Sequence, residues 1–267
     1  IVTNKLIEAL RKAGIYACVY SKVSDRFVSK TEDLKSAMVY VVGGTTVAGT
    51  YDDKYVIKKE GWGDYLQNYF ADQITVLNMA VDGKSSKSYI NESNYKNVFA
   101  NIAEGDYLII QFGTDDIDKA NEENYTNPKG DKETEGSFKY YLYNYYIKPA
   151  IDKKAIPIIV SPCPQSIFDN KQAVNVYSEY LAAIKEICLE TDSYYIILND
   201  VMLKTYTTNG EPKSDLCHAL YKNSSMGKNG RDVIGLSKYG ATETAKAILY
   251  QMGFSSATLK DYINTSK

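Results

Sequence analysis

The sequence predicts an α/β fold in which a doubly wound parallel sheet forms the middle of a three-layer α/β/α sandwich. Short, continuous apolar runs alternate along the chain with longer segments of helical apolar spacing. Runs of the first kind are typical of parallel strands buried on both faces, and strict alternation with helices favours βαβ connections. A length of 267 residues suits one large domain.

Six apolar runs are expected to be strands, and six segments with helical spacing are expected to be helices. The expected strands are residues 15–20, 37–42, 74–78, 106–112, 156–160 and 194–198. The expected helices are residues 2–13, 62–70, 95–102, 136–152, 173–190 and 237–251. Two polar stretches, 113–135 and 208–231, are expected to be connections. We expect residues 37–267 to form the domain, with 1–36 as an N-terminal extension that packs on it or precedes it.

Charge and hydropathy argue against some classes of partner. The formal net charge is -2, so no basic excess would attract nucleic acid or an anionic membrane. No apolar run approaches the roughly 20 residues that span a bilayer, and residues 1–6 lack the features of an export signal. No motif suggests a cofactor or a metal site.

Cysteine and tyrosine usage leave two questions open. Cys18, Cys163, Cys188 and Cys217 show no C-x-x-C spacing, so they indicate neither a zinc site nor a thioredoxin-like motif. They allow two disulfides in three pairings, or buried free thiols. The 25 tyrosines reflect either a general compositional bias or a surface that stacks on sugars.

Ligands of open α/β sheets bind outside the carboxyl ends of the strands. Four segments are expected there, and any chemistry should come from them: 43–46, 78–83, 112–116 and 232–237. The long polar stretch 113–135 follows one of these strand ends and is a candidate rim loop.

Several short motifs occur in an order that resembles the SGNH hydrolases, and most closely the rhamnogalacturonan acetylesterases. They are Gly61-Trp62-Gly63, Asn78-Met79-Ala80-Val81-Asp82-Gly83-Lys84-Ser85, Gln111-Phe112-Gly113, Ser161-Pro162-Cys163-Pro164 and Leu236-Ser237-Lys238-Tyr239-Gly240-Ala241. The resemblance covers most of residues 37–252. It implies the SGNH hydrolase fold, whose sheet is flavodoxin-like, and a carbohydrate esterase ancestry.

The positions that carry chemistry in that family are mostly replaced here. By the resemblance, Thr45 stands at the nucleophilic Ser, Gly44 at the preceding Asp, Asp115 at the Asn of the oxyanion hole, Thr114 at the His before it, and Gly235 at the general-base His. Gly83, an oxyanion-hole amide, and Asp232, which would orient the His, are retained.

These replacements predict a chain that hydrolyses esters poorly or not at all. A hydroxyl needs a base within hydrogen-bond reach, and Gly235 has no side chain. Loss of one oxyanion donor costs on the order of 10²–10³ in rate, and an ionised Asp115 would also repel the developing charge. We interpret the replacements as drift in an unused site. An acquired binding site and a rebuilt esterase with Thr45 as nucleophile are the alternatives.

A binding site in the old cleft would use side chains and backbone at the expected strand ends. The candidates are Gly44, Thr45, Thr46, Gly83, Thr114, Asp115, Asp116 and Asp232. We expect a structural or glycan-binding module of a secreted, polysaccharide-directed protein, located outside the cell or on its surface. Plant-wall polysaccharide or neighbouring domains would be its partners.

Four further features have a plain interpretation and a functional one. His218, the only histidine, is either a packing residue on a short helical pattern or a relocated base. Cys217 is either inert or a substitute nucleophile. Asp115, Asp116 and Asp118 are either solvated loop acids or oxygen ligands for Ca²⁺. Trp62 either packs in the core or forms a sugar platform.

Overall fold

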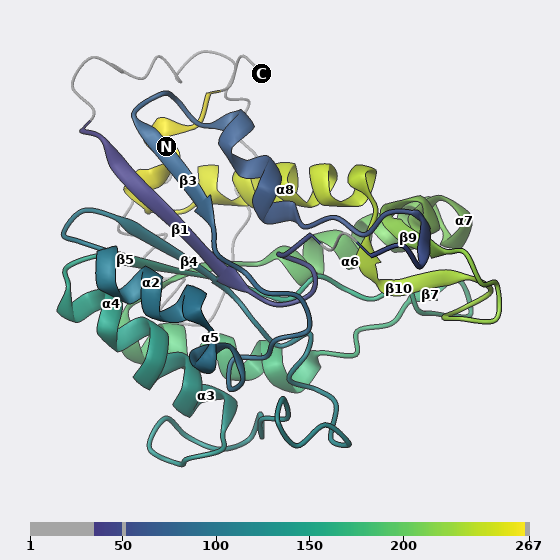
Figure 1. The fold of residues 1–267 in the computed structure, drawn as a ribbon, viewed down its shortest axis with the longest axis horizontal. Helices are drawn as coiled ribbons and strands as arrows, with labels where there is room; N and C mark the ends of the chain where they lie inside the picture. The colour runs from purple at the N-terminus through teal and green to yellow at the C-terminus, as the bar shows by residue number, and fades with distance from the viewer. Residues whose placement is uncertain (1–34, 50–51, 265–267) are drawn as a thin grey trace, which may run out of the picture.

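The fold is the expected three-layer sandwich around a five-stranded parallel sheet (Figure 1). The computed structural model describes residues 35–49 and 52–264. The main-sheet strands are β1 (Ala37–Gly43), β3 (Ile74–Asn78), β4 (Tyr107–Gln111), β5 (Ile156–Val160) and β8 (Tyr194–Ile196). Their order, β3-β1-β4-β5-β8, is that of flavodoxin-like sheets, in which the strand order reverses between β1 and β4.

Helices cover both faces of the sheet. One face packs against α2 (Ser93–Asn101), α3 (Phe138–Tyr141), the π-helical η4 (Leu142–Ile147), α4 (Lys148–Asp152) and α5 (Ser178–Thr191). The other packs against the 3₁₀ helix η2 (Trp62–Tyr69), α6 (Leu198–Asn209) and α8 (Lys238–Gly253). In β1, Val39 and Val41 join one core while Tyr40 and Val42 join the other, because strand side chains alternate. None of the described helices is long and apolar enough to cross a membrane.

A second, antiparallel sheet lies near the carboxyl ends of the main strands (Figure 1). It contains β10 (Arg231–Leu236), β9 (His218–Tyr221) and β2 (Tyr55–Ile57), in that order. A short hairpin of β6 (Phe168–Asp169) and β7 (Gln172–Ala173) completes the strands, and α7 (Glu211–Ser214), η3 (Tyr89–Asn91), η5 (Asp215–Cys217) and η6 (Thr258–Tyr262) complete the helices of the described chain. The small sheet brings residues from distant parts of the sequence to the edge where ligands would bind.

Several sequence expectations need correction here. Residues 208–231 are not a plain connection, because they contain α7, η5 and β9, and α6 before them was not expected. His218 begins a strand and lies outside any helix; β9 is stabilised by its pairing with β2 and β10, which a local pattern cannot reveal. The segment 232–237 is mostly strand β10. The elements expected at 2–13 and 15–20 lie outside the described residues.

Gln111, the last residue of β4, ties the turn after β1 to helix η2. Its fully buried amide oxygen accepts from Trp62 Nε1 at 2.8 Å and from Thr46 Oγ1 at 2.8 Å. Its amide nitrogen donates to the carbonyl oxygen of Ser161 at 2.9 Å. Trp62 is fully buried, so it packs in the core as the plain interpretation held, and Thr46 points inward and does not line a cleft.

We expect Gln111→Leu to lower the free energy of unfolding by about 2–4 kcal/mol, since two buried donors lose their acceptor and water cannot replace it. Chemical denaturation with a linear extrapolation measures the loss. Gln67→Leu is the matched control, because the exposed Gln67 also bonds to backbone groups but in contact with water. Equal losses in the two variants would contradict the assignment.

Candidate functional site

The pairing of β1 with β4 brings three of the expected site residues together. Gly43 lies opposite Gln111 at the carboxyl end of the pair, so the turns that follow each strand are neighbours. The amide of Val81 donates to the carbonyl oxygen of Gly43 at 3.0 Å, which fixes the segment after β3 beside the same turn. Thr45, Gly83 and Asp115 therefore meet at the point where the strand order reverses.

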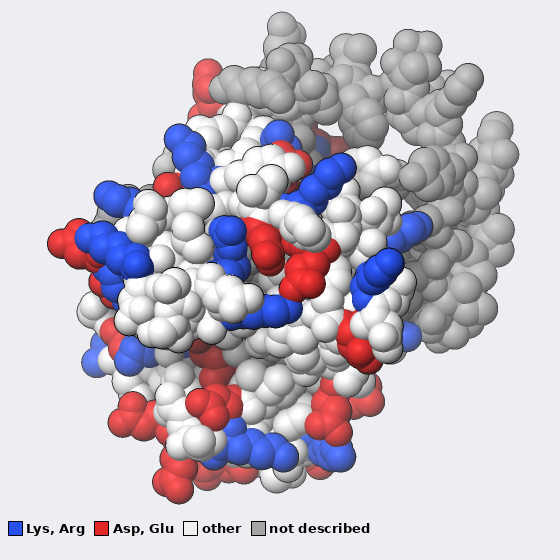
Figure 2. Space-filling view, turned by 90° about the vertical axis from the view of Figure 1, so that its right-hand side faces the viewer, with Lys and Arg blue, Asp and Glu red and all other residues white. Residues whose placement is uncertain are grey.

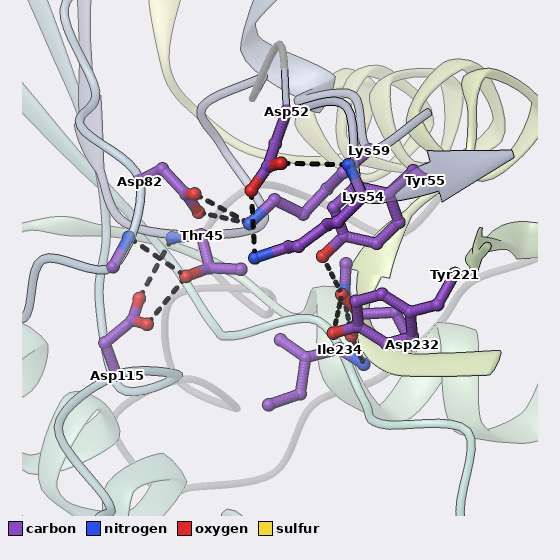
Figure 3. A network of polar contacts seen from close by, with 12 residues as sticks. Thr45, Asp52, Lys54, Tyr55, Lys59, Asp82, Asp115, Tyr221, Asp232 and Ile234 are labelled. Carbon is purple, nitrogen blue, oxygen red and sulfur yellow. Dashed lines mark hydrogen bonds and ion pairs between the residues drawn. The ribbon is translucent and has the colours of Figure 1, made fainter. Parts of the chain in front are cut away.

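The Asp115 carboxyl group binds both the amide and the hydroxyl of Thr45 (Figure 3). The Thr45 amide donates to Asp115 Oδ2 at 2.9 Å, and the Thr45 hydroxyl donates to Asp115 Oδ1 at 2.6 Å. Burial raises the pKa of Asp115, while the two hydrogen bonds from Thr45 lower it and the net change is upward. The hydroxyl that would be the nucleophile is thus held by a carboxyl group and has no imidazole beside it.

Gly83 completes this chain of hydrogen bonds. Its amide donates to Thr45 Oγ1 at 3.1 Å. The residue has φ +74°, in the left-handed region that glycine adopts without strain. Both backbone amides that the family resemblance assigns to an oxyanion hole, those of Thr45 and Gly83, are therefore occupied within the chain itself.

Gly44 does not line a cleft; its lack of a side chain makes room for Asp115. A Cβ added at Gly44 would lie 2.1 Å from Asp115 Oδ2 and 2.2 Å from the carbonyl oxygen of Lys84. Contacts below 3.0 Å are essentially never made by real Cβ atoms. The present position of the Asp115 carboxyl group therefore requires glycine at position 44.

Lys59, which the sequence reasoning did not single out, occupies the space beside Gly235. A Cβ at Gly235 would lie 2.5 Å from Lys59 Cδ and 2.6 Å from Asp232 Oδ2. The lysine side chain is only 7% exposed, and its ammonium group lies 2.6 and 2.7 Å from the two carboxylate oxygens of Asp82. The space that the side chain of residue 235 would enter is thus filled by the methylene groups of Lys59 and by Asp232. Figure 3 shows Lys59 bound to Asp82.

Asp232 is held by four hydrogen bonds, although the histidine that it would orient is absent. Its Oδ1 accepts from the amides of Ile234 and Gly235 at 3.0 and 2.8 Å, and its Oδ2 accepts from the hydroxyls of Tyr55 and Tyr221 at 2.7 and 3.0 Å. Burial raises the pKa of Asp232, but these four hydrogen bonds together lower it by more, so the net change is downward. The two tyrosine rings stack with centroids 4.6 Å apart.

Asp116 was expected among solvated loop acids, and that expectation is wrong. It is fully buried and accepts from the Gly113 amide, the Ser86 amide and hydroxyl, and the Thr126 hydroxyl. Burial raises its pKa to about 7 against these hydrogen bonds. Asp116 therefore fastens the segment 113–126 to the segment after Gly83 and does not line a cleft.

The hydrogen bonds of the Thr45 hydroxyl within the described chain go to Asp115 and Gly83, and to none of the other candidates. Thr114 is buried. Asp118 is exposed, and within residues 35–49 and 52–264 no group of three or more acidic, His or Cys side chains is placed to hold a metal ion. Cys163, Cys188 and Cys217 are buried free thiols, while Cys18 lies outside the described residues. Burial raises the pKa of the Cys217 thiol to about 11, which leaves it a poor nucleophile.

His218 is a packing residue. Its ring is completely buried, and Nε2 lies 3.0 Å from the hydroxyl of Tyr206. Burial lowers its pKa to about 4, so the imidazole is neutral at pH 7. The hydrogen bonds of Thr45 within the described chain go to Asp115 and Gly83, and none goes to His218. The relocated-base interpretation has no support in this geometry.

The surface beside Thr45, Gly83 and Asp115 is polar and of mixed charge. Figure 2 shows acidic and basic side chains close together near the middle of the face at the right of Figure 1. A groove of about 560 Å³ borders the segment after Gly83. It is lined by Lys84, Lys87, Ser88, Asn91, Glu122 and Glu123. Such a lining offers both donors and acceptors to a polar ligand.

We expect the cost of Gly235→Ala to depend on Lys59. In the parent the new Cβ meets Lys59 and Asp232, whereas in a Lys59→Ala background one of these contacts is gone. The loss of unfolding free energy caused by Gly235→Ala should be smaller by about 0.5–3 kcal/mol in that background. A denaturation double-mutant cycle measures the difference, with exposed Lys148→Ala as the control background. Strict additivity would show that Lys59 does not fill this space in solution.

The comparisons agree with the geometry of the fold. Residues 39–248 match the GDSL-like Lipase/Acylhydrolase family. The chain is 30% identical over 210 residues to the probable rhamnogalacturonan acetylesterase YesY of Bacillus subtilis, which covers 79% of this chain and 89% of the relative. The structure of B. subtilis YxiM aligns with a TM-score of 0.65 and 24% identity, over 84% of this chain and 58% of that one. The structure of the acetylxylan esterase Axe2 of Geobacillus stearothermophilus aligns with a TM-score of 0.57 and 15% identity, over 83% and 96%. The chain belongs to the GDSL-like lipase/acylhydrolase family within the SGNH superfamily, with homology to rhamnogalacturonan acetylesterases.

Proposed function

We propose that this chain does not hydrolyse esters and acts as a non-catalytic, carbohydrate-directed module of the acetylesterase type. The observation that supports this most directly is the hydrogen bond from the Thr45 amide to Asp115 at 2.9 Å. An acyl-transfer intermediate needs that amide for its oxyanion. Here the amide already has an acceptor in the chain, and this holds whether Asp115 is ionised or protonated.

The missing base supports the same proposal. Efficient attack by a hydroxyl requires a neighbouring group that takes its proton and later gives it to the leaving group. Gly235 supplies no such group, and the cation of Lys59 beside it is held by Asp82 at 2.6 Å. A cation paired with a carboxylate has no free electron pair with which to accept a proton.

Rebuilt hydrolysis is the second candidate, since Asp115 Oδ1 lies 2.6 Å from the Thr45 hydroxyl and could act as a general base. The geometry disfavours it. The same carboxyl group also binds the Thr45 amide, so the base would occupy a position needed by the oxyanion. The two candidates differ in the expected effect of Asp115→Asn, because this change abolishes turnover if Asp115 is the base, whereas a non-catalytic chain has no turnover to lose.

We expect no turnover of p-nitrophenyl acetate, acetylated xylan or acetylated pectin above the rate measured for Thr45→Ala. Acetate release and chromogenic assays measure it. Turnover that disappears in both Thr45→Ala and Asp115→Asn would overturn the proposal and establish the rebuilt site.

Restoring the family residues tests the same point from the other side. Thr45→Ser, Asp115→Asn and Gly235→His together should remain inactive, because Lys59 fills the space of the new imidazole. Adding Lys59→Ala should raise the rate by at least about 10²-fold, because it makes room for the imidazole and general acid–base catalysis contributes on that scale.

The carbohydrate-directed role is supported by relatives that are named acetylesterases of rhamnogalacturonan and xylan. The polar groove beside Gly83 is large enough for a short oligosaccharide, because ligand sites are typically about 300–1,000 Å³. A polysaccharide ligand would place the protein outside the cell or on its surface.

We expect oligosaccharides of acetylated xylan or pectin to bind in this groove, with weaker binding to Lys87→Ala than to the parent. The Lys87 ammonium group lies in the groove lining and donates to the carbonyl oxygen of Glu122 at 2.6 Å. Isothermal titration measures the affinity, and Lys148→Ala on the remote helix α4 is the control. Equal affinity of parent and Lys87→Ala would place the ligand elsewhere, and no heat with any oligosaccharide would contradict the role.

A further inference from the structure

The replaced positions of the site fit one another in pairs. Glycine at position 44 leaves the room that the Asp115 carboxyl group uses, since a Cβ there would lie 2.1 Å from Asp115 Oδ2. Glycine at position 235 leaves the room that Lys59 uses, since a Cβ there would lie 2.5 Å from Lys59 Cδ. The Lys84 carbonyl oxygen and the Asp232 carboxylate lie about as close to these added Cβ atoms, so each glycine fits a packed centre that includes a charged side chain.

We propose that the former reaction centre is now a small-carboxylate site, and that the chain's own Asp115 carboxyl group is the ligand bound in it. The Thr45 amide and hydroxyl, with Gly83 behind the hydroxyl, form that site. The inference goes beyond the absence of hydrolysis, because it states what now fills the centre and which class of molecule would fill it in place of Asp115.

The hydrogen-bond pattern identifies a carboxylate as the matching ligand. One oxygen of Asp115 accepts from an amide at 2.9 Å and the other accepts from a hydroxyl at 2.6 Å, which is a two-point grip on a planar anion. Hydrogen bonds to a carboxylate are charge-assisted, short and strong, so an ionised small carboxylate suits these donors. The position is held by the turn after β1 and by Gly83, so it persists when the Asp115 side chain is shortened.

Lys59, the second charged residue at this centre, links separate parts of the chain. Lys59 follows β2 in the small sheet, and Asp82 belongs to the segment after β3 of the main sheet. Their ion pair is only 7% exposed on the lysine side, so solvent screens it weakly. Lys59 thus connects the small sheet to the segment after β3, and Asp115 connects the segment after β4 to the turn after β1.

The test uses the whole chain and sodium acetate as the probe. Asp115→Ala removes the internal carboxyl group and leaves its partners in place. We expect its melting temperature to fall by several degrees and to rise again as acetate increases, while sodium chloride at the same ionic strength gives no such recovery. Binding to the folded state alone raises stability in this concentration-dependent way. The parent and the exposed-site control Asp118→Ala should respond equally to acetate and chloride.

Two results would overturn the proposal. One is an Asp115→Ala protein whose melting temperature responds no more to acetate than to chloride, and the other is an equal acetate response in the parent. If Asp115→Ala does not fold, Asp115→Ser, which retains a small polar group in the space, takes its place with the same expected outcomes. Ester turnover by the parent would contradict the proposed function and leave this melting experiment interpretable.

Discussion

The register between β1 and β4 is the constraint on which the site depends. Because Gly43 lies opposite Gln111, the chain leaves both strands at the same level and the next few residues of each must share one small volume. Thr45 and Asp115, 70 positions apart, become hydrogen-bonded neighbours for that reason. The hydrogen bonds that Gln111 accepts from Thr46 and Trp62 hold the turn after β1 against the core.

The sequence was a good guide to the sheet and to the residues around Thr45. The five described parallel strands coincide with the expected apolar runs. The signal is strongest in β1, β4 and β5, because burial on both faces selects apolar residues at successive positions. The resemblance also indicated that Thr45, Gly83 and Asp115 would share one edge. The small sheet was missed because β9 and β2 are short strands whose stability comes from pairing with distant segments.

Lys59 shows why the rest of the site was not predictable. It lies in no motif, and 176 positions separate it from Gly235, where an added Cβ would meet it. A missing histidine can be read from an aligned motif, but the side chain that fills its place cannot. Likewise, Asp116 looks in the sequence like its exposed neighbour Asp118, and only the packing of Ser86 and Thr126 around it shows that it is buried.

The burial of Trp62 makes the protein its own spectroscopic probe. It is the only tryptophan in the chain, and its indole nitrogen donates to Gln111 directly beneath the turn that presents Thr45. Indole fluorescence from this molecule therefore has a single source located beside the rearranged centre. Any loosening of the β1 turn that admits water to Gln111 shifts that emission toward the red, with no label added.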